Sequence, residues 1–102
     1  MALDIHTGKS RTSHQYQFSV EEDQYDAFRD AIRASGLSLH KLGRLQDYYS
    51  DACFKPEELP GLAADLTLMI ETEGMPCELA LRLLKLVDLA IKNNEHVFAF
   101  AD

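Results

Sequence analysis

Histidine and cysteine are the side chains of this sequence with the widest chemistry, because both bind metals and both serve in catalysis. The chain has six of them: His6, His14, His40, His96, Cys53 and Cys77. They lack the close ligand spacing of zinc sites, and no CxxC pair occurs. His6, His14 and His96 fall in segments with a strand pattern, so two of these rings could meet across a sheet. We expect no metal site and no cofactor, with these histidines at the surface or edge of the sheet.

Cys77 is the residue that a catalytic hypothesis would choose as nucleophile. It falls in the first turn of a predicted helix, where the helix dipole lowers the pKa of a thiol. Nucleophilic catalysis also needs a base and an oxyanion site, and the sequence marks neither. Cysteine is also a common small buried hydrophobe. We therefore predict no catalytic residue and keep a small His/Cys-dependent enzyme or ligand-binding domain as an alternative.

The run Gly8-Lys9-Ser10 has the letters that end a phosphate-binding loop. The full motif also needs a glycine five positions before Gly8, where this chain has Leu3, and a helix directly after the serine. An alternating strand pattern follows instead. We interpret residues 7–13, which carry Lys9 and Arg11 and no acid, as a cationic hairpin tip.

Residues 47–51 are the strongest candidate for a binding surface, with the sequence Asp47-Tyr48-Tyr49-Ser50-Asp51. They fall in a predicted loop, and tyrosine is enriched at binding hot spots because it gives a large contact area. The flanking carboxylates could accept hydrogen bonds from Arg or Lys of a partner. In the alternative interpretation one tyrosine packs under the loop and the acids cap the next turn. We predict a binding site that includes Asp47, Tyr48, Tyr49 and Asp51.

The densest acidic segment follows residue 20. Asp23, Asp26 and Asp30 are spaced three and four residues apart, which places them on one side of a predicted helix. Such a side is typical of a solvated helix, and it could also face a basic partner. We include these three aspartates in the predicted binding site.

Composition limits the class of partner. The 102 residues fit a single globular domain, 1–102, that is long enough to bury a core without disulfides. The chain has 17 Asp and Glu against 10 Lys and Arg, a formal charge of -7. This balance argues against nucleic-acid binding, which needs a basic surface, and is compatible with a basic protein partner.

Location is predicted from the amino-terminal segment and from the most apolar segment. Residues 1–6 show no charged region followed by an apolar region, so we expect no signal peptide and a cytoplasmic protein with reduced thiols. The most apolar stretch, residues 77–91, carries charges and is shorter than the roughly 20 residues that span a bilayer. We expect no membrane association.

Residues 77–91 are predicted to be the central helix of the fold. Five apolar residues recur with helical periodicity on one face: Leu79, Leu83, Leu86, Val87 and Ala90. Four more widen that face: Leu81, Leu84, Leu89 and Ile91. A helix this apolar should be covered on several sides.

The strand predictions rest on alternation. Residues 3–6 and 14–20 should form an amino-terminal hairpin, with Tyr16, Phe18 and Val20 on one face, and residues 96–101 should form a third strand beside it. Residues 52–54 are expected only to bring the chain back to the core.

The helix predictions rest on caps and breaks. Ser19 and Glu22 form a capping-box pattern for a helix at 20–35, which Gly36 should end. A short helix at 39–46 and a long helix from 57 or 61 to 72 should follow. Together with the strands, these elements predict an α+β fold in which three to four helices pack on a three-stranded antiparallel sheet. The alternative is a mostly helical bundle with a minor ribbon.

The leading hypothesis is a non-catalytic protein-interaction module that binds a basic protein surface. In size and charge the chain is similar to small acidic bacterial proteins that neutralise a toxin or regulate an enzyme, and no motif assigns it to a family. A third hypothesis is a self-associating domain, a homodimer formed through an exposed edge of the carboxy-terminal strand with Phe98 and Phe100.

Overall fold

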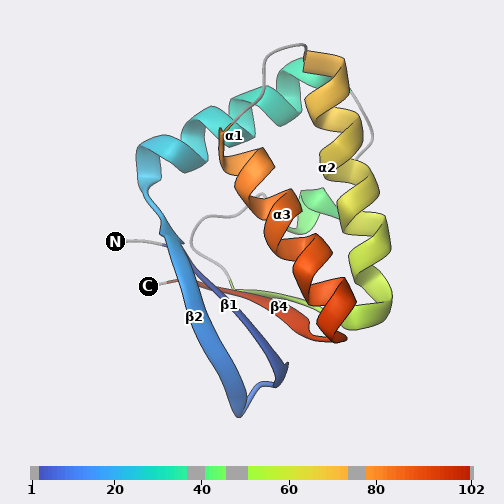
Figure 1. Ribbon diagram of the computed structural model, residues 1–102. Coiled ribbons are helices and arrows are strands. Elements are labelled where there is room, and N and C mark those ends of the chain that lie inside the picture. The colour runs from blue at the N-terminus through green and yellow to red at the C-terminus, as the bar shows by residue number, and fades with distance from the viewer. Residues whose placement is uncertain (1–2, 37–40, 46–50, 74–77, 102) are drawn as a thin grey trace.

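The computed structural model describes residues 3–36, 41–45, 51–73 and 78–101. Three helices lie on one side of an antiparallel sheet (Figure 1). In chain order the elements are β1 (Leu3–Ser10), β2 (Ser13–Val20), α1 (Glu22–Ser35), the 3₁₀ helix η1 (Leu42–Leu45), β3 (Ala52–Phe54), the 3₁₀ helix η2 (Pro56–Glu58), α2 (Leu59–Glu73), α3 (Glu78–Asn93) and β4 (His96–Ala101). The α+β class is as predicted.

The sheet has four strands in the order β2-β1-β4-β3, so the prediction of three strands is wrong. The additional strand, β3, pairs with β4 and places Phe54 opposite Val97, where both side chains are buried. Three residues are too few to show alternation in the sequence. Their strand conformation depends on β4, which is distant in the chain.

The carboxy-terminal strand β4 is an inner strand. It pairs with β1 from His96 to Ala101 and with β3 from Val97 to Ala99. Beyond β3, the Ala101 N–H donates to Asp51 Oδ1 at 2.7 Å. The exposed edge predicted for this strand is therefore wrong, because β3 occupies it. The long free edge of the sheet belongs to β2.

A β-bulge changes the face to which Tyr16 belongs. Ile5 pairs with Phe18, and the next residue of β1, His6, pairs with Tyr16. The extra residue in β2 reverses the alternation beyond it. Phe18 and Val20 are buried in the core, whereas Tyr16 is 56% exposed. The prediction that these three side chains share one face is therefore wrong for Tyr16.

Helix α1 begins two residues later than the capping pattern predicted. Ser19 stays in β2 and donates its hydroxyl hydrogen to Asp4 Oδ1 at 2.6 Å. Glu21 is the N-cap, and its N–H donates to Gln24 Oε1 at 3.1 Å. The predicted end is confirmed: Gly36 has φ 66°, a left-handed conformation that glycine adopts without steric cost.

Helix α3 confirms the predicted central helix but is covered less than expected. Its buried residues are Leu79, Ala80, Leu83, Leu86, Val87 and Ala90. Leu81, Leu89 and Ile91 are 44%, 54% and 38% exposed. The sheet, α1 and α2 pack on α3, and nothing described lies beyond it. The prediction of coverage on several sides therefore holds in part, because the outer side of α3 is exposed.

Across the described ranges, no helix combines the length and apolar character needed to cross a membrane.

Candidate functional site

The three predicted aspartates of α1 lie along its outer side. Asp23 and Asp30 are exposed. Asp26 is half-buried and forms an ion pair with Arg29, with Oδ1 and Nη2 3.2 Å apart. On the opposite side of the helix Phe28 is 1% exposed in the core. The helix therefore holds two exposed carboxylates on a packed element, and one of them, Asp23, accepts the Gln24 N–H at its Oδ1 (2.9 Å).

The predicted tyrosine loop is mostly outside the described residues. Asp47, Tyr48 and Tyr49 all fall there, so their part of the binding site stays a prediction. Asp51 is described and exposed, and its Oδ1 accepts the Ala101 N–H. This carboxylate therefore serves the fold by continuing the hydrogen bonding of β4 past the end of β3.

The outer face of the sheet, which turns away from the helices, brings two histidines together. His6 on β1 and His14 on β2 have Nδ1 atoms 3.0 Å apart. Around them are the rings of Tyr16, Phe98 and Phe100, with centroids 5.1 to 5.6 Å from a histidine ring. The prediction that two histidines could meet across the sheet is confirmed for this pair.

The environment of His6 disfavours its charged form. Burial is the main cause that lowers the pKa of His6, and the nearby His14 lowers it further, while Asp4 acts in the opposite direction. Within the described residues no group of three His, Cys, Asp or Glu side chains is placed to hold a metal ion. The His6–His14 contact is therefore best described as a hydrogen bond between two rings, at least one of which is neutral.

The hairpin tip has the cationic character predicted from the sequence and docks on a helix end. Strands β1 and β2 extend to Ser10 and Ser13, so only two residues form the turn. Lys9 Nζ donates a hydrogen bond to the carbonyl oxygen of Asn93, the last residue of α3. Strand β2 follows the run Gly8-Lys9-Ser10, so this run has no helix behind it to bind phosphate with backbone amides.

Beside the hairpin tip lies a cleft of about 380 Å³, which we call the hairpin cleft. Four cationic side chains line it: Lys9, Arg11, Arg44 and Lys55. Cys53, Glu58 and His96 contribute to the same wall. The sequence signalled only Lys9 and Arg11, which are close together in the chain. Arg44 and Lys55 come from other segments, so no spacing rule connects them with the hairpin.

Comparison with known proteins adds no assignment: no protein-family model, no curated protein and no solved structure matches the chain.

Proposed function

We propose that the protein is a non-catalytic interaction module that binds a basic surface of another protein through the outer side of α1. The observation that carries this proposal is the exposure of Asp23 and Asp30 on a helix whose inner side is packed in the core. Glu21 and Glu22, also exposed, extend the negative surface at the start of the helix. Rigid support matters because a fixed carboxylate loses little conformational entropy on binding.

The expected mechanism is electrostatic complementarity. A negative surface on a protein of formal charge -7 attracts a basic partner before contact. This attraction raises the association rate, and it weakens as the ionic strength rises. Asp26 already pairs with Arg29, and Asp23 Oδ1 accepts the Gln24 N–H, so Asp30 is the most available of the three aspartates among the described contacts. Residues 47–51 extend this proposal as a sequence-based prediction. An inhibitor or an immunity protein is one concrete form of such a module.

The proposal is tested by quantitative capture from a lysate of the source organism. A tagged wild-type protein is compared with the variant Asp23→Asn/Asp26→Asn/Asp30→Asn, and bound proteins are measured by mass spectrometry. We expect one basic partner in stoichiometric amount, lost at high salt, and reduced at least about tenfold by the variant because charged contacts are removed.

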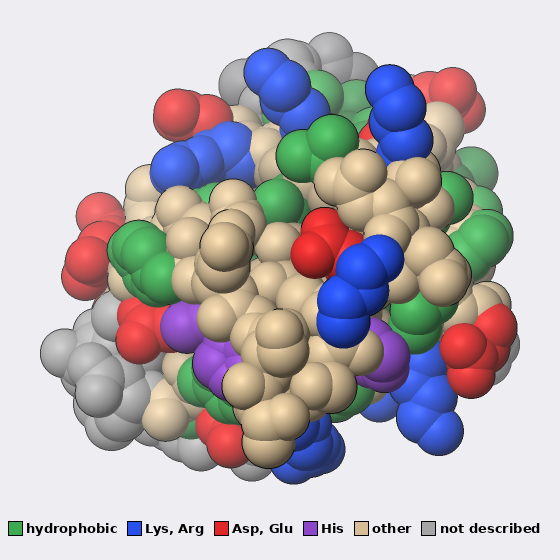
Figure 2. Space-filling view, turned by 60° about the horizontal axis from the view of Figure 1, so that its bottom comes forward, with side chains coloured by type: hydrophobic (Ala, Val, Ile, Leu, Met, Phe, Trp, Pro, Cys, Tyr) green, Lys and Arg blue, Asp and Glu red, His purple; other side chains and the backbone are tan. Residues whose placement is uncertain are grey.

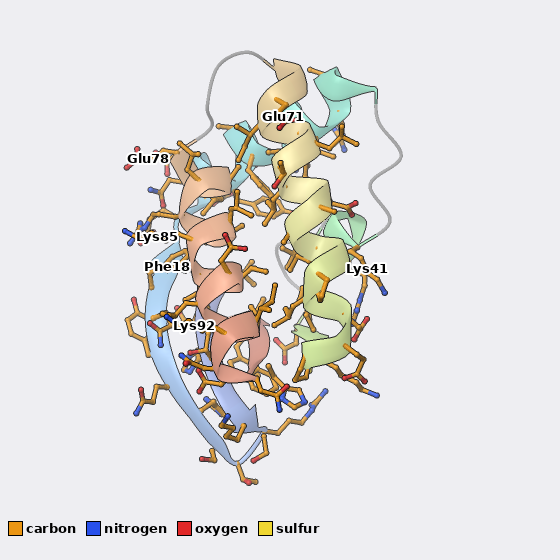
Figure 3. All side chains as sticks on the ribbon, turned by 45° about the vertical axis from the view of Figure 1, so that its right-hand side comes forward. Phe18, Lys41, Glu71, Glu78, Lys85 and Lys92 are labelled. Atoms are coloured by element: carbon orange, nitrogen blue, oxygen red, sulfur yellow. The ribbon has the colours of Figure 1, made fainter. Side chains whose placement is uncertain are left out.

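A matched control removes the same number of charges elsewhere. Glu71, Glu78 and Asp88 are exposed acids of α2 and α3, and Figure 3 labels Glu71 and Glu78 on these helices. The variant Glu71→Gln/Glu78→Gln/Asp88→Asn should keep the partner. If both variants are folded, as judged by circular dichroism, and both lose the partner to the same extent, net charge rather than α1 mediates capture. Undiminished capture by the α1 variant would refute the assigned surface.

A further inference from the structure

The hairpin cleft concentrates positive charge on an acidic protein. Among the described residues, its lining includes four Lys or Arg side chains and one acid, Glu58. Seen from the hairpin end, Lys and Arg side chains lie next to a histidine (Figure 2). Like charges gathered in this way repel one another unless an anion balances them.

Arg44 is held in a fixed orientation at the cleft. Its two terminal nitrogens donate to Glu58 Oε2 and to the carbonyl oxygen of Cys53, and its guanidinium carbon lies 4.6 Å from the centroid of the Phe54 ring. A guanidinium has five N–H groups, so donors remain after these two contacts. The orientation of Arg44 is therefore set before any ligand arrives.

Glu58 does not neutralise the rest of the cleft. Its Oε1 accepts the Lys55 N–H at 3.1 Å, and its Oε2 contacts both Arg44 and Lys41. The Lys55 backbone N–H is the main cause that lowers the pKa of Glu58, and Lys41 and Arg44 lower it further. Both oxygens of this ionised carboxylate therefore contact Lys55, Arg44 and Lys41, and neither contacts Lys9 or Arg11.

Arg11 and Lys55 line the cleft and have no anionic partner within the described part of the chain. Among the described residues, no hydrogen bond or ion pair engages the side chains of Arg11 and Lys55, and both residues are exposed. Lys9 uses one of its three ammonium donors on the Asn93 carbonyl oxygen. The cleft therefore has unused donors on the hairpin tip and, across from it, on the segment after β3.

His96 adds an aromatic imidazole ring to the lining of the cleft. Its ring stacks on Phe98, with centroids 5.6 Å apart and planes at 4°, and it lines the cleft. The Nδ1 atom is buried and has no hydrogen-bond partner within the described part of the chain.

We propose that the hairpin cleft binds an oxyanion, either free phosphate or the phosphate group of a small phosphorylated molecule. Guanidinium and ammonium groups recognise phosphate by charge-assisted hydrogen bonds, and Arg44 keeps N–H donors beyond its contacts with Glu58 and Cys53. The ligand would balance the unpaired charges of Arg11 and Lys55. This inference does not depend on the proposed function, because it concerns different residues.

The test is a titration of the ¹⁵N-labelled protein with inorganic phosphate at constant ionic strength, followed by NMR. We expect saturable shifts of the backbone amides at Lys9, Arg11, Cys53, Lys55 and His96. The variant Arg11→Ala/Lys55→Ala should raise the dissociation constant for phosphate at least about tenfold, since it removes two charged contacts. Both side chains are exposed, so the variant should fold, which thermal melting checks.

The matched control is Arg33→Ala/Lys85→Ala, which removes one arginine and one lysine that are exposed and do not line the cleft. It should leave the dissociation constant within about twofold. Amide shifts that do not saturate would overturn the proposal. An equal rise of the dissociation constant in both variants would also overturn it, because phosphate would then act only by screening the charges of the protein.

Parallel titrations identify the source of the oxyanion. Tighter binding of glycerol phosphate than of inorganic phosphate would support a phosphorylated molecule. Tighter binding of inorganic phosphate would support the free ion. Equal shifts with acetate or chloride would overturn phosphate recognition. The variant Asp23→Asn/Asp26→Asn/Asp30→Asn should still bind phosphate, so failure of the protein-partner proposal and failure of this one can be distinguished.

Discussion

The Nδ1 atoms of His6 and His14 lie 3.0 Å apart across the first two strands of the sheet. One ring must donate and the other accept, so the contact cannot exist when both rings are doubly protonated. Burial and the proximity of His14 lower the pKa of His6. We therefore expect the amino-terminal hairpin to be sensitive to pH.

We predict that acid weakens the fold through His6. The unfolded chain has the ordinary histidine pKa of about 6.5, whereas folded His6 has a lower one, so the unfolded state binds more protons between the two values. The free energy of unfolding should therefore decrease as the pH falls from about 6.5 to the folded pKa of His6, and change little further from this residue below it.

Urea unfolding at several pH values between about 7.5 and 5 measures this dependence. The variant His6→Gln serves as the comparison, because glutamine can hydrogen-bond but does not titrate in this range. Its free energy of unfolding should depend less steeply on pH than that of the wild type. Parallel pH profiles for the two proteins would rule out a contribution from His6.

Gly8 is required by a close approach between β1 and β2. A Cβ atom at this position would lie 2.2 Å from the Ser13 carbonyl oxygen and 2.6 Å from His14 Cβ. The first of these is backbone that cannot move without disturbing the strand pairing. We predict that Gly8→Ala destabilises the protein by about 1–3 kcal/mol, as overpacking does. Urea unfolding measures the change.

Gly61 is the matched control for Gly8. It lies in α2, where a Cβ would be 3.2 Å from Cγ of the flexible Lys41 side chain. Alanine favours a helix over glycine by roughly 0.5–1 kcal/mol. Gly61→Ala should therefore be neutral or stabilising. A similar loss of stability in both variants would contradict the assigned role of Gly8.

Two leucines of α3 distinguish its buried side from its exposed side. Leu83 is 4% exposed and Leu89 is 54% exposed. Leu83→Ala should lower the free energy of unfolding by about 2–5 kcal/mol, because it leaves a cavity in the core. Leu89→Ala should change it by at most about 0.5 kcal/mol, since no buried contact is lost.

Chemical unfolding of the two variants under the same conditions gives this comparison. A loss at Leu89 as large as that at Leu83 would mean that the outer side of α3 is covered in solution. Coverage of this helix on several sides, as expected from its sequence, would lead to that result.

Much of the secondary structure could be predicted because its signals are local. Helix α3 follows from its apolar periodicity, and the end of α1 follows from Gly36, whose φ is 66°. β3 could not be predicted in this way. Three residues carry no periodic pattern, and Ala52 to Phe54 form a strand only because β4 offers an unpaired edge.

The candidate sites also differ in whether their residues are close together or far apart in the sequence. Asp23, Asp26 and Asp30 share a side of α1 because helical spacing is a property of contiguous sequence. The hairpin cleft joins Arg11, Arg44 and Lys55, which come from three different segments. Spacing cannot reveal a site whose members are brought together only by the packing of distant elements.

By itself the sequence determined the α+β class, the positions of the long helices and the excess of acid, because periodicity, caps and charge are properties of neighbouring residues. Tertiary structure alone decided the strand order, the bulge that turns Tyr16 outward, the His6–His14 contact and the cationic cleft. These features depend on which distant strands pair and in which register. Those choices are made by long-range packing, and a one-residue change of register moves a side chain to the other face of the sheet.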